Sequence, residues 1–399
     1  MNNINLTTGT DNLTGTSGDD TFVSTYNDDA TAYTFGIADV LDGGAGIDTL
    51  DIDTNHVAAI TPVDSYWGEL TNIEKLVIHG GAGAQTITTA GAFEASFAAA
   101  GIDLTLESLA GAITLDMKTF TGTAAITTTS TGGAQTITSG IGATTVVAVS
   151  TDGAETISGT GLTSVTATST HGAQTISGVN LTSVVATSGD GAQTITGMNL
   201  VTVIAHTAGA QTITTGPGAH VITASAAAEN NAIVSKAGND VISVDAATGG
   251  YHIRAGGGHD LINGGTGNDF LDGGAGKDTI NAGAGNDVIF GGAGRDTLSG
   301  GAGNDDFLLS ANGFDTITDF SVANDTIRID HSVFTALTSI TADNLVIGAH
   351  AADANDFLAY NSNSGKLSYD ADGNGAGHAV VIAVLGTHLE LTSSDFMVL

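Results

Sequence analysis

The stretch from Ala255 to Leu308 decides the fold, and it reads AGGGHDLIN, GGTGNDFLD, GGAGKDTIN, AGAGNDVIF, GGAGRDTLS and GGAGNDDFL. These are six consecutive units of nine residues with no insertion between them. Each unit has a glycine-rich beginning, an aspartate in sixth place and an apolar residue two places later. The aspartates are Asp260, Asp269, Asp278, Asp287, Asp296 and Asp305. A period this regular indicates a solenoid of stacked repeats.

Glycine and aspartate serve different purposes in such a unit. Glycine permits tight turns with positive φ that expose backbone carbonyls, and aspartate adds a hard anionic oxygen of the kind Ca²⁺ prefers. The next three residues form a very short strand whose central apolar side chain points inward. Two units make one coil, so turns stack at intervals of 18 residues. Asp260, Asp278 and Asp296 then line one edge, and Asp269, Asp287 and Asp305 line the other.

These units resemble the GGxGxD nonapeptides of RTX proteins, the hemolysin-type calcium-binding family. The resemblance implies an all-β fold, a parallel β-helix or β-roll solenoid with small flanking β domains. It also implies Ca²⁺ held between turns by the aspartate carboxylates and by glycine carbonyls. Ala255 and Ala282 replace the first glycine of their units, which a carbonyl ligand tolerates. The glycines so implied are Gly256, Gly258, Gly265, Gly267, Gly274, Gly276, Gly283, Gly285, Gly292 and Gly294.

The same register continues on both sides of the block. Upstream, the run Gly238-Asn239-Asp240-Val241-Ile242 predicts Asp240 as a further ligand. Downstream, Gly313-Phe314-Asp315-Thr316-Ile317 follows after a slip of one residue, which marks the end of the regular roll. Asp315 is the candidate ligand there.

The middle of the chain repeats another phrase, GAQTIT or a close variant. Its last five copies begin at Gly133, Gly153, Gly172, Gly191 and Gly209, at spacings of 20, 19, 19 and 18 residues. Aligned by glycine and isoleucine, Gln135, Gln174, Gln193 and Gln211 stand where the metal aspartates stand. An amide keeps the hydrogen-bonding oxygen and loses the charge, so these coils are expected to stack through glutamine ladders without metal. We expect a solenoid over roughly residues 80–317, with residues 91–110 as a helical insertion.

In each Thr-Ile-Thr the isoleucine is expected to point inward and both threonines outward, which gives two threonine ladders. Such arrays resemble the ice-binding faces of β-solenoid antifreeze proteins. Outward threonines are also what exposed strands prefer, and a flat uncharged face permits packing against another copy. Ice binding, adhesion to a glycan and lateral packing therefore remain open.

The amino-terminal region contains isolated turns of the calcium type. They are Leu13 to Phe22, ending in Asp20, and Leu41 to Leu50, ending in Asp48. Together with the threonine-rich repeats, this arrangement resembles RTX-type bacterial surface-layer and extracellular matrix proteins.

The carboxyl-terminal region, Ala351 to Leu385 with the final SDFMVL, resembles the end of RTX proteins exported by type I secretion. That pathway reads an uncleaved carboxyl-terminal signal, which agrees with a polar amino terminus without the pattern of a signal peptide. Asp370, Asp372 and Asn374 resemble a calcium loop, although a plain turn explains them equally well.

The composition limits the classes of partner that the chain is expected to bind. The formal net charge of −34 repels nucleic acid phosphates and anionic membranes and favours cations. Cysteine is absent, so neither disulfides nor thiolate metal sites stabilise the chain. No segment has the length of a membrane span. We therefore expect no nucleic acid partner and no membrane insertion.

No catalytic constellation stands out: HExxH, GxSxG and a cysteine nucleophile are all absent. GxGxxG matches arise incidentally in any glycine-rich repeat. A pectate-lyase-like groove served by carboxylates such as Glu155 is the enzymatic alternative to a non-enzymatic chain. The expected function is a secreted structural protein of the bacterial cell surface that folds on Ca²⁺ and assembles with copies of itself. Its other expected partners are the type I secretion machinery and cell-surface polysaccharide.

The expected division of the chain has four parts. Residues 1–80 form an amino-terminal β region, and residues 81–236 form a threonine-rich, metal-poor solenoid. Residues 237–317 form the calcium β-roll, and residues 318–399 form a carboxyl-terminal β domain with the secretion signal.

Overall fold

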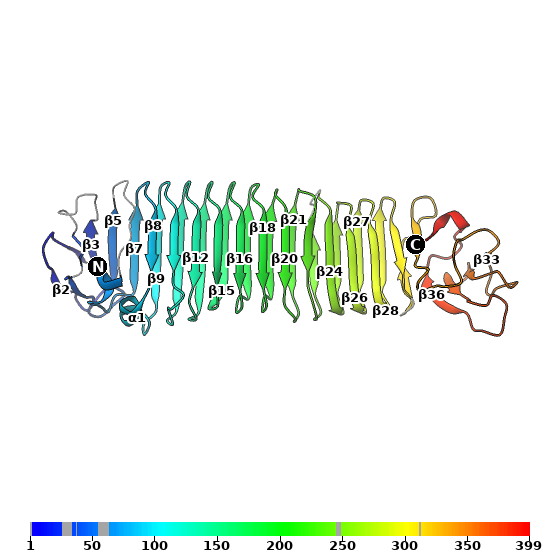
Figure 1. Cartoon of the computed structure of the whole chain (residues 1–399), viewed down its shortest axis with the longest axis horizontal. Helices are drawn as coiled ribbons and strands as arrows, with labels where there is room; N and C mark the ends of the chain where they lie inside the picture. Colours follow the sequence, from blue (N-terminus) through cyan, green and yellow to red (C-terminus); the bar gives the residue numbers. More distant parts are fainter. Residues whose placement is uncertain (1, 26–33, 37, 55–63, 245–248, 311–312) are drawn as a thin grey trace. The chain divides into compact units, whose positions relative to one another are not determined.

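The computed structural model describes residues 2–25, 34–36, 38–54, 64–244, 249–310 and 313–399. It divides into two compact units, Met1–Gly209 and Ala210–Leu399. Within each unit, short strands lie beside one another in parallel, as the arrows in Figure 1 show. The expected all-β parallel solenoid is confirmed.

The long sheet of unit 1 collects one strand from each coil, and all its pairings are parallel. It begins near the amino terminus, well before the expected start near residue 80. The strands are β1 (Asn2–Asn5), β3 (Asp20–Thr25), β5 (Thr49–Thr54), β7 (Lys75–Gly80), β9 (Ile102–Ser108), β11 (Ala124–Ser130), β13 (Thr144–Ser150), β15 (Leu162–Ser169), β17 (Ser183–Ser188) and β19 (Thr202–Thr207).

The opposite sheet of unit 1, the threonine sheet, is built from the repeated GAQTIT phrases. Its strands are β8 (Gln85–Thr88), β10 (Ile113–Asp116), β12 (Gln135–Ser139), β14 (Glu155–Gly159), β16 (Gln174–Gly178) and β18 (Gln193–Gly197). The phrase Gly111-Ala112-Ile113 belongs to this series with an isoleucine in place of glutamine. A small sheet contains β2 (Asn12–Thr14), β4 (Val40–Asp42) and β6 (Leu70–Thr71).

Among the described residues the α-helix is α1 (Gly91–Phe97). The backbone N–H groups of Ala92 and Phe93 donate to the carboxylate of Asp64, in the 3-10 helix η1 (Asp64–Trp67), at 2.8 and 3.1 Å. Phe93 packs edge-on against Trp67, with ring centroids 5.6 Å apart. The expected helix is thus present over residues 91–97, but residues 102–108 form strand β9. No helix among the described residues is long and apolar enough to cross a bilayer.

Unit 2 repeats the two-sheet plan. Its first sheet contains β21 (Val221–Ala226), β23 (Val241–Val244), β25 (Leu261–Gly265), β27 (Thr279–Ala284), β29 (Thr297–Ala302) and β31 (Asp315–Ile317). Its second sheet contains β20 (Gln211–Thr215), β22 (Asn231–Val234), β24 (Tyr251–Gly258), β26 (Phe270–Gly276), β28 (Val288–Gly294), β30 (Asp306–Leu309), β32 (Thr326–Ile329) and β37 (Phe396–Val398), which follows the 3-10 helix η2 (Ser393–Asp395).

The carboxyl-terminal part of unit 2 departs from the parallel pattern. Strand β33 (Leu345–Ile347) pairs with β34 (Leu358–Asn361), which continues antiparallel into β35 (Lys366–Tyr369) and β36 (Val380–Val384). Strand β36 then pairs in parallel with β31, the last strand of the first sheet. This small β region therefore covers the end of the coil stack, which would otherwise present an open sheet edge.

The core is a thin line of aliphatic side chains. Each coil contributes at least one aliphatic residue from each sheet, such as Ile176 and Val184 in unit 1 or Ile280 and Ile289 in unit 2, and all four are fully buried. Burial of one such side chain stabilises the fold by about 1.5 to 3 kcal/mol. Alternation along each strand sends the neighbouring residues outward, which confirms that isoleucine points inward and threonine outward in Thr-Ile-Thr.

Candidate calcium sites

The aspartates of the first sheet of unit 2 form one column. The backbone N–H of each donates to Oδ1 of the aspartate in the following coil. The bonds run from Asp240 to Asp260 at 2.7 Å, from Asp260 to Asp278 at 2.8 Å, from Asp278 to Asp296 at 2.8 Å and from Asp296 to Asp315 at 3.1 Å. The carboxylates are therefore stacked one coil apart along one edge.

A second column follows the other edge. Asp269 donates to Asp287 at 2.8 Å, Asp287 to Asp305 at 3.0 Å and Asp305 to Asp325 at 3.1 Å, in the same N–H to Oδ1 pattern. The two columns are those expected from the 18-residue interval.

One oxygen of each repeat aspartate has no protein partner. Oδ2 is buried and accepts no hydrogen bond in any of the six nonapeptide units. The residues are Asp260, Asp269, Asp278, Asp287, Asp296 and Asp305, each at most 3% exposed. A buried carboxylate oxygen without a partner is costly unless a cation neutralises it. The columns thus fit a hard divalent cation between successive coils.

Burial also shifts the acidity of these groups. It raises the pKa of Asp269 to about 7 and of Asp278 to about 6, and the neighbouring carboxylates of each column add to the rise. The pKa of Asp287 rises to about 6 and that of Asp315 to about 7, again mainly through burial. Protons and cations therefore compete for the same oxygens.

The glycine-rich turns supply the remaining oxygens. Within the described ranges, no three acidic or histidine side chains converge on one point. Since Ca²⁺ takes six to eight oxygens, backbone carbonyls and waters must complete any site. Gly258 and Gly276 have φ of +146° and +138°, and a Cβ on Gly276 would overlap the Gly258 carbonyl of the preceding coil. Only glycine lets these turns nest. The role of the ten glycines as ligands stays a prediction.

Asp240 differs from the repeat aspartates below it. Its Oδ1 lies 2.6 Å from Nδ1 of His220, and its Oδ2 accepts a hydrogen bond from Ser235 Oγ. His220 and Asp240 are both at least 98% buried. Both carboxylate oxygens of Asp240 therefore have protein partners, whereas Asp260 keeps one free.

The second column begins with uncharged groups. Asp269 accepts the N–H of Tyr251 at 2.7 Å, and the Tyr251 hydroxyl donates to Gln211 Oε1 at 2.9 Å. The N–H of Gln211 in turn donates to Asn231 Oδ1 at 2.9 Å. Gln211 thus stands in the register of the aspartates, as the phrase alignment predicted.

The amino-terminal turns repeat the same bonding in unit 1. Asp20 donates its N–H to Asp48 at 2.7 Å, and Asp48 donates to Glu74 at 2.9 Å. Oδ2 of Asp48 is buried without a partner, as in the roll, and burial raises the pKa of Asp48. Hydrogen bonds from Thr16 lower the pKa of Asp20.

The carboxyl-terminal candidates lie apart from both columns. Asp372 accepts the N–H of Gly377 at 3.0 Å and donates its own to Asp370 at 3.3 Å. The Asn374 side chain donates to the Ala352 carbonyl at 3.2 Å. Asp372 and Asn374 are exposed, and these bonds are those of a turn. Calcium binding there stays a prediction.

Besides Glu74, three column members were not foreseen from the sequence. Asp325 ends the second column of unit 2, and Asp11 donates its N–H to Asp39 at 2.9 Å in unit 1. The signal was present, since each is followed two places later by an apolar residue, as in Asn324-Asp325-Thr326-Ile327. The irregular spacing between these copies of the motif concealed the pattern.

The metal-poor coils carry amides in the equivalent interior positions. Gln193 Nε2 donates to Gln174 Oε1 at 2.9 Å, and Gln174 Nε2 donates to Glu155 Oε2 at 2.7 Å. The expected glutamine ladder is present and needs no cation. Glu155 is fully buried in this row, and its Oε1 has no hydrogen-bond partner.

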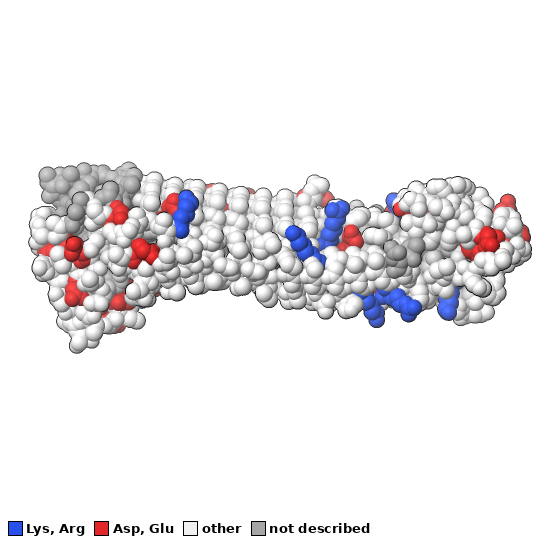
Figure 2. Space-filling model, turned by 60° about the horizontal axis from the view of Figure 1, so that its bottom comes forward, with Lys and Arg blue, Asp and Glu red and all other residues white. Residues whose placement is uncertain are grey.

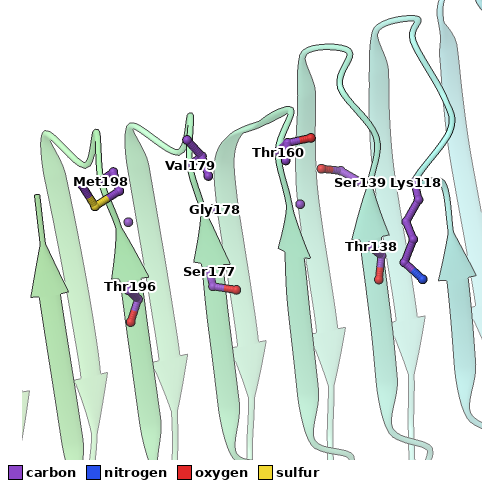
Figure 3. Close-up of a pocket in the computed structure, with 11 residues that line it drawn as sticks. Lys118, Thr138, Ser139, Thr160, Ser177, Gly178, Val179, Thr196 and Met198 are labelled. Atoms are coloured by element: carbon purple, nitrogen blue, oxygen red, sulfur yellow. The ribbon is translucent and has the colours of Figure 1, made fainter.

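A groove runs along one edge of the threonine sheet (Figure 3). Its charged lining residue is Lys118, whose Nζ lies 2.8 Å from Asp116 Oδ2. Glu155 lies inside the coil and does not line the groove, so the proposal that it serves a groove is wrong. Among the described residues that line this groove, Lys118 is therefore the charged side chain, and no carboxylate accompanies it in the lining.

We expect calcium binding to weaken as the pH falls through about 7 and 6, the values to which burial raises the pKa of Asp269 and Asp278. In the metal-free protein, by contrast, lower pH is expected to favour the folded state. Folded carboxyls keep protons that unfolded ones release above about pH 4, so metal-free stability falls as the pH rises from there to about 7. Calorimetric calcium titration and melting in EGTA, each at about pH 5.5 and 7.5, check both trends. Equal affinity at the two pH values would contradict the assignment.

Comparison with known families agrees with this geometry. The family model of the RTX calcium-binding nonapeptide repeat matches residues 4–29 and 33–51, and in overlapping copies residues 252–280, 272–307 and 281–317. The matched segments contain the two amino-terminal turns and the six units of the roll. A search of curated proteins gave no match.

Proposed function

Since the chain is an RTX repeat protein that binds calcium through its β-roll, we propose that it is a secreted structural protein that folds on Ca²⁺ outside the cell. The observation that carries this proposal is the set of six buried Oδ2 atoms without a partner. In a cytoplasm poor in calcium these carboxylates destabilise the roll, and millimolar external calcium neutralises them. Extracellular calcium modules typically bind at about 10⁻⁴ to 10⁻³ M, which suits such a switch.

Export through a type I pathway is part of the proposal. The carboxyl-terminal region, with the antiparallel strands β34, β35 and β36, is the candidate signal region. The partners would then be the secretion machinery, copies of the chain and cell-surface polysaccharide at a bacterial surface. The net charge of −34 disfavours nucleic acid and anionic membranes.

After folding, we infer, the protein assembles into a surface layer or an extracellular filament without acting as an enzyme. Strands β11 to β19 form parallel sheets whose outward residues include no Asp, Glu, Lys or Arg, and such a surface suits contact between copies. Electron microscopy of the purified full-length protein in millimolar calcium is expected to show ordered assemblies, and EGTA is expected to dissolve them. Monomers that persist in calcium at high concentration would overturn the assembly role.

Ice binding remains a second candidate because Thr194 and Thr196 are both exposed on β18, in register with Thr175 and Ser177. Thermal hysteresis that disappears when Thr194 and Thr196 are replaced would favour it. Adhesion to a glycan is the further alternative.

A further inference from the structure

The outward face of the long sheet carries several apolar side chains among threonine and serine in the middle of unit 1. The pairings place Val147 beside Thr166, Thr166 beside Val185 and Val185 beside Ile204. Val147, Val149 and Ile204 are 41%, 39% and 36% exposed. We call the outward residues of β13, β15, β17 and β19 the valine face, after Val147, Val149 and Val185.

The valine face is uncharged within a strongly anionic chain. Between Thr119 and Gly209 the only Asp, Glu, Lys or Arg residues are Asp152, Glu155 and Asp190, and none of them belongs to the valine face. Figure 2, which draws one face of the molecule, shows a largely white surface over the middle of unit 1. Nearer the amino terminus the same sheet is charged, since Asp51, His79 and Glu107 interact on its outer side. The neutral surface therefore has a defined border.

The charge distribution favours a second copy of this chain as the partner of the valine face. Two molecules of net charge −34 repel each other over most of their surface, and the repulsion is weakest where uncharged faces meet. An all-parallel sheet is usually covered on both faces, and exposed valine and isoleucine gain from removal from water. The threonine sheet gains less, because the outward residues of β12, β14, β16 and β18 are all threonine or serine, whereas the valine face also presents three valines and an isoleucine.

The area of the face suits a weak contact between copies, of the kind that an assembly repeats many times. Its four strands, at a spacing of about 4.8 Å and each about 20 Å long, cover roughly 400 Å². Two such faces bury roughly 800 Å² in total, below the roughly 1,000 Å² that a stable specific interface buries. A two-fold axis would bring the same patch of each copy into contact.

We propose that two copies of this chain pack through their valine faces, sheet against sheet. The inference rests on the assembly role proposed above and names the surface that performs it. The contact repeats the layered packing of sheets about 10 Å apart, with the row from Val147 through Val185 to Ile204 crossing the whole face.

The test compares glutamate substitutions on the two faces of unit 1 in the full-length protein. Val147→Glu and Ile204→Glu place a carboxylate in the proposed contact, and Thr175→Glu places one on the exposed threonine sheet as the matched control. Sedimentation velocity in millimolar calcium is expected to show self-association of the wild type and of Thr175→Glu. The two valine-face variants are expected to associate at least about tenfold more weakly, because like charges meet in the contact.

The outcomes separate the two proposals. A wild type that stays monomeric overturns the assembly role and this inference together. Undiminished association of Val147→Glu and Ile204→Glu overturns only the valine face, and loss in Thr175→Glu would move the contact to the threonine sheet. Circular dichroism reports whether each variant folds. If glutamate prevents folding, Val147→Thr with Val149→Thr tests the same contact, since threonine already occupies neighbouring positions such as Thr127 and Thr129. That pair is expected to weaken association, and unchanged association would overturn the proposal.

Discussion

Removal of calcium at neutral pH is expected to unfold the coils of unit 2 between Asp260 and Asp315 and to leave the coils of unit 1 between β11 and β19 folded. The roll buries six carboxylate oxygens that no protein donor satisfies, whereas the middle of unit 1 has amides that hydrogen-bond to one another. Each bound ion stabilises the folded state by about 1.4 kcal/mol at ten times its dissociation constant. Several ions together therefore supply as much as the typical net stability of a domain.

Hydrogen exchange followed by mass spectrometry checks this expectation segment by segment. In EGTA, peptides from β25 to β30 should lose most of their protection, and peptides from β12 to β18 should keep theirs. Magnesium at the same concentration should restore less protection, because it keeps its waters and demands octahedral geometry. Equal protection of β25 to β30 with and without calcium would contradict the ligand assignment.

Asp278→Asn should weaken calcium binding by the roll, a milder change than complete removal of calcium. The amide keeps the shape of the side chain and removes the charge, so calcium affinity is expected to fall about tenfold, the effect of about 1.4 kcal/mol. Asp152→Asn is the matched control, since it removes the same charge from an exposed turn of unit 1.

Replacement of Glu155 by glutamine is expected to stabilise unit 1 by about 3 kcal/mol at pH 7. Burial raises the pKa of Glu155 to about 8, although a hydrogen bond from Gln174 opposes the rise. The unfolded carboxyl ionises near its usual value of 4.5. Between these two values the folded state binds more protons than the unfolded state, so stability falls as the pH rises and levels off above about 8. Glutamine does not titrate in this pH range, and it would stand in register with Gln135 and Gln174 on either side.

Denaturant unfolding of unit 1 at about pH 4.5, 7 and 9 measures the difference between wild type and Glu155→Gln. The gain should be small at the lowest pH and largest at the highest. Asp152→Asn, with an exposed side chain in the preceding turn, should show no comparable gain. A gain that is the same at every pH would mean that Glu155 is not protonated in the folded protein.

The sequence predicted the regular part of the fold because the period is explicit there. A single apolar position two places after each aspartate determines both the strand and the edge on which the carboxylate lies. The same rule applied to irregular spacing would have found Asp325 and Asp39, which were missed because the loops between copies differ in length. The alignment with Gln135 and Gln174 could also have placed Glu155 inside the coil instead of in a groove.

Other features depend on stacking between coils and have no local signature. The pairing of His220 with Asp240 joins residues that are 20 positions apart, in coils longer than the 18-residue repeat. The Tyr251 hydroxyl reaches Gln211 across two coils. Such contacts require the register of the whole stack, which a search for nonapeptides does not provide.

Successive nonapeptides contribute their aspartates alternately to the two columns, so it matters whether the roll changes in length by an odd or an even number of units. Loss or duplication of a single nonapeptide would transfer every later aspartate to the opposite column. The strands that follow β25, β27 and β29 would then join the other sheet. Loss or duplication of a pair would leave both columns intact. Over evolutionary time the roll should therefore lengthen and shorten in even numbers of units, with odd changes confined to its ends.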